Sequence, residues 1–251
     1  MSSALIKPAL LAAVGDASKG FSRRALLSAG AVLATGLSGC SRRVDQTVRL
    51  KLLFEVETPQ GKSFPSGVWQ FDATEVPAMP GSRISRYLRG QAIPVLIEDD
   101  QSVFAMTVWN GLGLPNPTIS SLYQWDGVHV LGRVSDIDIS WVDRSSPGLE
   151  AAKSRAPTEP VSVPPDLFPA FAMFTNPADP ASGRLVKPEE IFTAKGDPVS
   201  VKLKIQIVHE PPTTGIETHL PWLRETRARN SRELGSDSFA SHPDNFLGWT
   251  R

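Results

Sequence analysis

His129 and three nearby carboxylates form the densest group of side chains in this sequence that could carry out chemistry. Asp126 lies three residues before His129, and Asp136 and Asp138 follow it. A histidine beside a carboxylate can act as a general acid or base, and carboxylate oxygens bind hard cations such as calcium. Two carboxylates on one strand face are too few to hold a cation alone, so a solvated strand face is the commoner interpretation. A hydrolase or metal-dependent enzyme that uses His129 with these aspartates is therefore the alternative function.

The rest of the chain lacks the short motifs that mark common catalytic sites. There is no Gly-x-Ser-x-Gly, no His-Glu-x-x-His, no phosphate-binding loop and no dinucleotide fingerprint. The four histidines are scattered singly along the sequence. A Ser-His-Asp arrangement needs no fixed spacing, so a hydrolase stays open, but the pattern favours a binding or structural domain. We expect no dedicated catalytic residue, no metal and no cofactor.

Cys40, the only cysteine, ends a short uncharged segment near the N-terminus. Arg23 and Arg24 precede a 14-residue run without charge at positions 25–38. A basic region, a short apolar region and small residues before a cut describe an export signal. The run is shorter than the about 20 apolar residues that a membrane-crossing helix needs. We therefore expect residues 1–39 to be an export signal rather than a membrane anchor.

The sequence LSGC at residues 37–40 resembles the lipobox of bacterial lipoproteins. This resemblance implies that the leader is cut before Cys40, that the Cys40 sulfur is linked to diacylglycerol, and that its new amino group is acylated, for example with palmitate. A single acyl chain holds a protein only marginally at a membrane, whereas several chains anchor it stably. The alternatives are an ordinary cleaved signal and a chance LSGC in a soluble chain.

Residues 22–27, with Arg23 and Arg24 at their centre, resemble the twin-arginine export motif. Ser28 departs from that pattern, in which Lys is frequent at this place, so general secretion is the alternative route. Ser41 resembles the residues that permit sorting of lipoproteins to the outer membrane. Together these resemblances imply a cell-envelope protein that is lipid-anchored to a membrane, with the outer membrane facing the periplasm favoured.

Composition limits what the mature chain can be. Cleavage before Cys40 leaves 212 residues, enough for one domain or two small ones. The leader carries four basic residues and one acid, so the mature chain keeps 22 basic and 25 acidic residues, a net charge near −3. A dedicated nucleic-acid binder usually shows a basic excess, so we expect no nucleic-acid partner. With its only thiol lipidated, the domain has no disulfide and no cysteine-type zinc site.

Alternating apolar residues predict the main strands. Residues 48–56 and 199–207 place apolar side chains at every second position, which is typical of half-buried strands. Pro and Gly after the first of these predict a turn at residues 58–61. Further strands are predicted at 67–75, 92–98, 102–109 and 127–141. The strands at 92–98 and 102–109 are expected to form a hairpin. The strand at 127–141 is expected to have a bulge near Gly132. The sum is a mainly β fold, an antiparallel sandwich-like domain with one or two short helices.

The remaining segments complete the expected organisation. Residues 40–46 are the lipidated tether, and 47–222 are the β-rich domain. Nine prolines between positions 145 and 188 predict a long crossover, in which the apolar residues 166–174 dock on the core. Residues 188–196 read as a short helix. Residues 223–251 form a polar, Arg-rich tail of low order.

Two groups of side chains suggest where a partner binds. Arg83, Arg86 and Arg89 recur every third residue, so a helix would join them in one basic stripe, whereas a strand would divide them between faces. Such a stripe would contact anionic lipid or an anionic envelope polymer, and a solvated loop is the plainer interpretation. The tryptophans would fill the core or line a groove. We therefore expect an envelope lipoprotein whose β-rich domain binds a partner protein or envelope polymer.

Overall fold

Alternation of apolar and polar residues builds the central strand of the domain. β1 (Gln46–Thr58) buries Val48, Leu50, Leu52, Phe54 and Val56 on one face, and the residues between them stay partly accessible. The computed structural model describes residues 46–77, 82–98, 101–109, 118, 122–135, 158–226 and 239–248, except for the side chains at 46, 74–77 and 82–86. All of these residues belong to the unit Arg43–Arg251.

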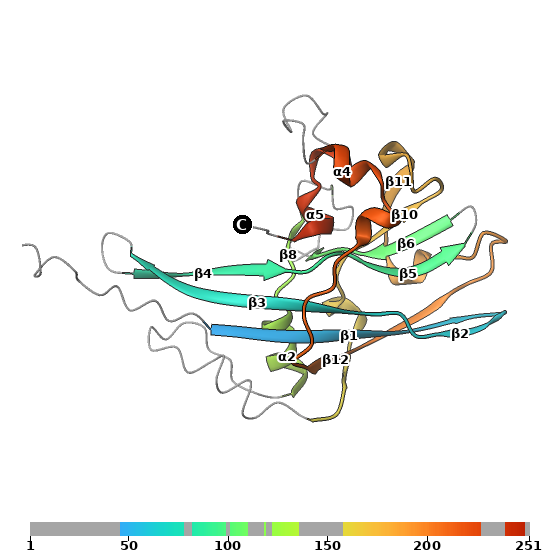
Figure 1. Ribbon diagram of the computed structural model, residues 1–251. Coiled ribbons are helices and arrows are strands. Elements are labelled where there is room, and N and C mark those ends of the chain that lie inside the picture. The colour runs from blue at the N-terminus through green and yellow to red at the C-terminus, as the bar shows by residue number, and fades with distance from the viewer. Residues whose placement is uncertain are drawn as a thin grey trace, which may run out of the picture. The chain divides into compact units, whose positions relative to one another are not determined.

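β1 lies at the centre of the larger of two main sheets (Figure 1). The strand order is β4-β3-β1-β12-β9, with β2 also paired to β1, and every pairing is antiparallel. The other strands of this sheet are β2 (Gly61–Ser63), β3 (Ser66–Pro77), β4 (Ser82–Arg89), β9 (Val161–Val163) and β12 (Ser200–Ile207).

A second sheet packs over the larger one. Its order is β11-β10-β6-β5, again antiparallel. Its strands are β5 (Ile93–Glu98), β6 (Gln101–Ala105), β10 (Phe171–Phe174) and β11 (Gly183–Val186), and a small third sheet pairs β7 (Val108–Trp109) with β8 (Tyr123–Gln124). Phe54 of β1 meets Phe171 of β10 edge to face, with ring centroids 6.2 Å apart. Both sheets thus contribute to one apolar core.

The second sheet is buried on both faces. Val103 and Met173 point into the core shared with β1, whereas Phe104 and Phe174 join a second apolar cluster on the opposite side. The chain after β12 and the C-terminal segment cover that side. The helical elements are α2 (Gly127–Ser135), α4 (Trp222–Thr226), α5 (Asp244–Leu247) and the 3₁₀ turns η2 (Pro165–Leu167), η3 (Pro180–Ser182), η4 (Pro188–Glu190), η5 (Ile216–Thr218) and η7 (Phe239–Ser241).

The segment after β12 crosses the outer face of the larger sheet on its way to this cover (Figure 1). Lys51 of β1 forms an ion pair with Glu210, with Nζ 2.9 Å from Oε1. Thr213 then bonds to the edge of β3, because its N–H donates to the Val68 carbonyl and its hydroxyl accepts from the Val68 N–H. These contacts fix the segment after β12 to β1 and β3 of the larger sheet.

The predicted fold class is confirmed: the domain is mainly β, antiparallel and sandwich-like, with a few short helices. The strands predicted at 48–56, 67–75 and 199–207 are present as β1, β3 and β12. The hairpin is present as β5 and β6, although the second run breaks between Ala105 and Val108.

The strand predicted at 127–141 is wrong for its first part, which is helix α2. Val128, Val130 and Leu131 are buried while His129 and Arg133, four residues apart, are exposed, which is helical spacing. The imperfect alternation that predicts a strand bulged near Gly132 is thus the pattern of a helix. Residues 136–141 lie outside the described part of the chain.

Three other segments differ from the prediction. The proline-rich stretch is more than a crossover, because it contains β9, β10 and β11; its prolines flank these strands, and residues 166–174 do dock on the core. The helix predicted at 188–196 is a single 3₁₀ turn, η4. The prediction of low order in residues 223–251 is wrong at Leu223, Phe239 and Phe246, because these side chains are fully buried.

Candidate functional site

Two neighbouring hollows lie at the end of the larger sheet where β1 begins. In the strand register Thr47 of β1 lies opposite Asp72 of β3, and Asp72 lies opposite Tyr87 of β4. Asp72 lines the first hollow, which we call the β3 hollow, and Tyr87 lines the second, the β4 hollow. Gln124 of β8 lines both of them, so the two hollows share a wall.

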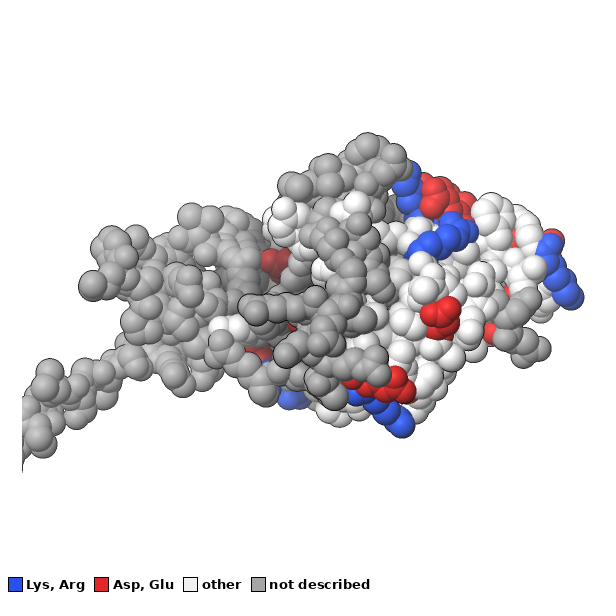
Figure 2. Space-filling view, turned by 90° about the horizontal axis from the view of Figure 1, so that it is seen from above, with Lys and Arg blue, Asp and Glu red and all other residues white. Residues whose placement is uncertain are grey.

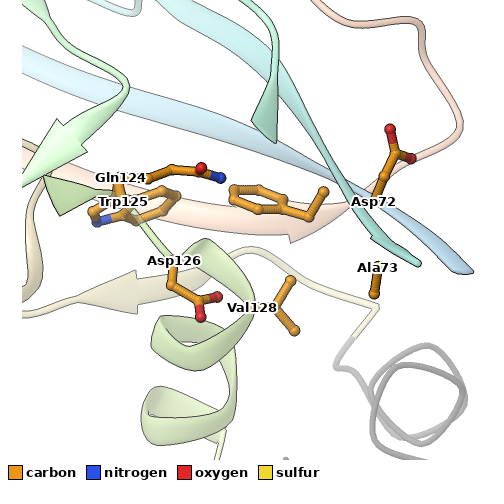
Figure 3. A pocket seen from close by; sticks show the side chains of 7 residues that line it. Asp72, Ala73, Gln124, Trp125, Asp126 and Val128 are labelled. Atoms are coloured by element: carbon orange, nitrogen blue, oxygen red, sulfur yellow. The ribbon is translucent and has the colours of Figure 1, made fainter. Parts of the chain in front are cut away.

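The β3 hollow has a volume of about 210 Å³. Residues 71–73 of β3 form one side, and the segment that leads into α2 forms the other (Figure 3). The Asp72 carboxylate accepts hydrogen bonds from the Thr47 hydroxyl at 2.7 Å and the Gln70 amide at 2.9 Å, and its other oxygen lies 2.7 Å from Nε of Arg89. Oδ1 of Asp72 therefore links β1 to β3, and Oδ2, which is buried with no hydrogen-bond partner among the described residues, forms an ion pair with Arg89 of β4.

Asp126, on the opposite wall of the β3 hollow, has a structural role as well. Its Oδ1 accepts a hydrogen bond from the N–H of His129 at 3.1 Å, and it directly precedes Gly127, the first residue of α2. An aspartate at this position caps one of the unpaired N–H groups of the first helical turn. Figure 3 shows its carboxylate beside that turn.

The β4 hollow is larger, with a volume of about 550 Å³. Its walls come from β4, from the β7–β8 pair and from the C-terminal segment 241–248. The polar and aromatic side chains among its lining residues are those of Tyr87, Thr107, Tyr123, Gln124, Ser241, His242, Asp244 and Asn245. The chain has only two tyrosines, and both line this hollow.

Thr107 positions the C-terminal wall of the β4 hollow. Its N–H and its hydroxyl both donate to the Asn245 carbonyl, at 2.9 Å each. Gly248 closes the wall against β4 through a bridge to Arg89, with a φ of 61°. A Cβ at Gly248 would lie 2.7 Å from the Gly90 carbonyl oxygen, so only glycine allows this close approach.

Asn245, on the C-terminal wall of the β4 hollow, has an unused hydrogen-bond donor. Nδ2 of Asn245 is buried and has no hydrogen-bond partner among the residues that the structure describes. Buried polar groups are usually paired, because an unpaired one costs about 1–3 kcal/mol.

The lining chemistry limits what the β4 hollow can accommodate. Its described lining contains hydroxyl, amide and imidazole groups and the Asp244 carboxylate beside the apolar Leu88, Val108 and Leu122, and it includes no Lys or Arg. Hydrogen-bonding groups next to aromatic rings suit a ligand with hydroxyl or amide groups and an apolar face. On the face drawn in Figure 2, basic and acidic side chains are interspersed.

The three arginines predicted as a surface site lie on β4, so they do not form the single stripe that a helix would give. Strand periodicity puts positions 83 and 89 on one face and position 86 on the other. Arg89 is half-exposed and bound to Asp72. Cys40 and the export-signal residues Arg23 and Arg24 lie outside the described residues.

The structure does not assemble the predicted group around His129. His129 is exposed on α2 and does not line either hollow, while Asp126 is the helix cap. Asp136 and Asp138 lie outside the described residues. Within the described part of the chain, no three His, Cys, Asp or Glu side chains come together as a metal site.

Comparisons with family models, curated proteins and solved structures find no match to this chain. None of the helices in the described ranges has the length and apolar character that a bilayer crossing requires. The site is therefore interpreted from its own geometry.

Proposed function

We propose that this protein is a lipid-anchored lipoprotein of the bacterial cell envelope, and that its β-rich domain binds a ligand or partner at the β4 hollow. The leader with Arg23 and Arg24 and the lipobox that ends at Cys40 support the anchor. Ser41 supports the outer membrane, facing the periplasm, as its location.

The observation that carries the binding role is a hollow lined by both tyrosines and by Asn245, whose buried Nδ2 has no hydrogen-bond partner among the described residues. Binding is favoured over catalysis because the carboxylates of the neighbouring β3 hollow are already engaged. Asp72 accepts hydrogen bonds from Thr47 and Gln70 and forms an ion pair with Arg89, and Asp126 caps α2. The supported ligands are a neutral envelope polymer or a segment of a partner protein, both of which carry hydroxyl or amide groups.

The anchor is tested with Cys40→Ala. The wild-type protein is expected to incorporate labelled lipid and to sediment with membranes, and the variant to do neither. Ser41→Asp is the matched control, because it retains the acceptor thiol and is expected to stay lipidated but to move to the inner-membrane fraction. A Cys40→Ala protein that remained firmly membrane-bound would remove the basis of the proposal.

The binding site is tested with a matched pair of exposed aromatic residues. Tyr123 on the wall of the β4 hollow is 52% exposed, and Phe64 between β2 and β3 is 70% exposed. Cells that express the acylated protein are crosslinked, and the adducts of Tyr123→Ala and Phe64→Ala are compared with those of the wild type. The proposal expects an adduct that Tyr123→Ala loses and Phe64→Ala keeps; equal loss or equal retention would contradict the assignment of the site.

A further inference from the structure

We infer that an arm formed by the ends of β3 and β4, residues 74–77 and 82–86, lies against an anionic lipid bilayer. This inference rests on the proposed lipid anchor at Cys40, and it identifies which surface of the anchored domain faces the membrane.

The arm extends past the beginning of β1. Gln46, the first residue of β1, pairs with Ala73 of β3. Beyond that level β3 continues to Pro77, and its last residues pair only with β4, ending at the pair Pro77 and Ser82. Four more residues at about 3.3 Å each carry the arm about 13 Å beyond the start of β1. Figure 1 shows both strands running past that point.

The tether brings the same end of the domain to the membrane. Six residue steps separate Cys40 from Gln46, and a fully extended chain of that length spans about 20 Å. β1 has 13 residues, so its other end lies about 40 Å further along the strand. A tether of this length lets the arm reach the lipid head groups.

The charge of this end suits anionic lipid. The arm contains Arg83 and Arg86 against one acid, Glu75, and the tether adds Arg42 and Arg43 against Asp45. A basic residue near an anionic surface strengthens contact by roughly fivefold. Two arginines could not hold a free protein at a membrane, but on a tethered domain contact is intramolecular, so a small gain is enough to set the orientation.

This orientation has a consequence for the binding site. Tyr87 of the β4 hollow lies at the level of Thr47, one residue after the start of β1. The hollow is therefore placed at the membrane-facing end of the sheet, beside the arm, where it meets ligands that lie close to the bilayer surface.

The test uses the mature acylated protein in vesicles of phosphatidylcholine with or without phosphatidylglycerol. Because Cys40 is the only cysteine and its sulfur is linked to lipid, an introduced cysteine is the single free thiol. Ser82→Cys puts a fluorescent label at the start of β4, on the arm. Ser200→Cys puts it at the start of β12, opposite Glu57 near the far end of β1. Nitroxide head groups then report contact with the bilayer by quenching.

The expected result is strong quenching of the Ser82 label in vesicles that contain phosphatidylglycerol, and little quenching of the Ser200 label. Because positions 83 and 86 lie on opposite faces of β4, only one of Arg83→Gln and Arg86→Gln, the one on the face toward the bilayer, should lower the contact equilibrium roughly fivefold. Lys204→Gln, at an exposed position on β12, should leave it unchanged. If the protein floats with the vesicles but both labels are quenched equally, or the Ser82 label is not quenched, the proposed orientation is overturned while the lipid anchor stands. If the native wild-type protein carries no lipid on Cys40 and does not float with the vesicles, the proposed anchor is overturned as well.

Discussion

Trp69 and Trp125 meet edge to face in the core, with ring centroids 5.2 Å apart and ring planes inclined by 72°. Each indole N–H donates to a backbone carbonyl, Trp69 to Gln91 at 2.7 Å and Trp125 to Leu167 at 2.9 Å. The pair therefore ties β3 to the segment before β5 and to η2. Because Trp125 also precedes the cap of α2, this contact positions one wall of both hollows.

Two substitutions of Trp125 should distinguish the stability contributed by its indole hydrogen bond from the stability contributed by the packing of its ring. Trp125→Phe keeps a ring but leaves the Leu167 carbonyl unpaired, a cost of about 1–3 kcal/mol. Trp125→Ala also opens a cavity, and large aromatic-to-alanine changes in cores cost about 3–5 kcal/mol. Urea unfolding measures both values, with Trp109→Phe at a half-buried position as the control. Equal costs for the two Trp125 variants would show that the hydrogen bond contributes little.

Gly127→Ala should destabilise the domain, although alanine is the better helix former by about 1 kcal/mol. A Cβ at this first residue of α2 would lie 2.4 Å from the Trp125 ring, 2.9 Å from Leu50 and 2.9 Å from Phe71. Overpacking of this kind costs about 1–3 kcal/mol. Gly215→Ala is the control, because a Cβ there meets no atom and only its φ of 100° opposes the change. A Gly127→Ala protein more stable than the wild type would contradict the packing described here.

Asp126 substitutions distinguish a helix cap from a catalytic acid. Asp126→Ala should lower the free energy of unfolding by about 0.5–2 kcal/mol, the usual value for a lost cap. Asp126→Asn keeps a side-chain oxygen and should cost little. His129→Ala should be nearly neutral, because the cap bond uses the backbone N–H of His129. Thermal unfolding of the three variants provides the measurement; a large cost for Asp126→Asn would assign the carboxylate charge another role.

The strands that alternate cleanly were predictable from the sequence. In β1 and β12 one face is buried and the other is partly wet, so burial leaves a period-two pattern. β10 leaves no such pattern, because Phe171 and Met173 enter one core and Ala172 and Phe174 enter the other. A strand buried on both faces reads only as a short apolar run. Its neighbouring prolines then favoured a crossover.

The site was less predictable than the fold, because its residues are brought together by tertiary structure alone. Tyr87, Tyr123, His242 and Asn245 come from three separate segments and share no motif. The C-terminal wall was obscured further by the polar sequence around it, in which Phe239 and Phe246 are isolated apolar residues. One usable signal was composition: a chain with only two tyrosines places both in the same hollow.

Glu55 gives a pH-dependent prediction. Its hydrogen bond to Lys62, and then the charge of Lys202, lower the Glu55 pKa from its ordinary 4.5. A carboxyl with a lowered folded-state pKa stabilises the fold above its ordinary pKa and loses this effect as pH falls through the lowered value. Glu55→Gln should thus be less stable than the wild type at neutral pH and equally stable in strong acid. Urea midpoints across pH test this; because the groups are exposed, salt should shrink the difference, and a difference independent of pH would contradict it.

Phe246 tests whether the C-terminal segment is part of the fold. Its ring is fully buried and lies 5.6 Å from the rings of Trp222 and Phe239, measured between centroids. Phe246→Ala should therefore cost about 3–5 kcal/mol and should also impair the β4 hollow, because the adjacent Asn245 carbonyl is held by Thr107. Thr107→Val is the companion variant: it removes the hydroxyl bond while keeping the volume, and should cost about 1 kcal/mol. A segment that merely rests on the surface would make Phe246→Ala neutral in urea unfolding, and that outcome would remove the C-terminal wall from the site.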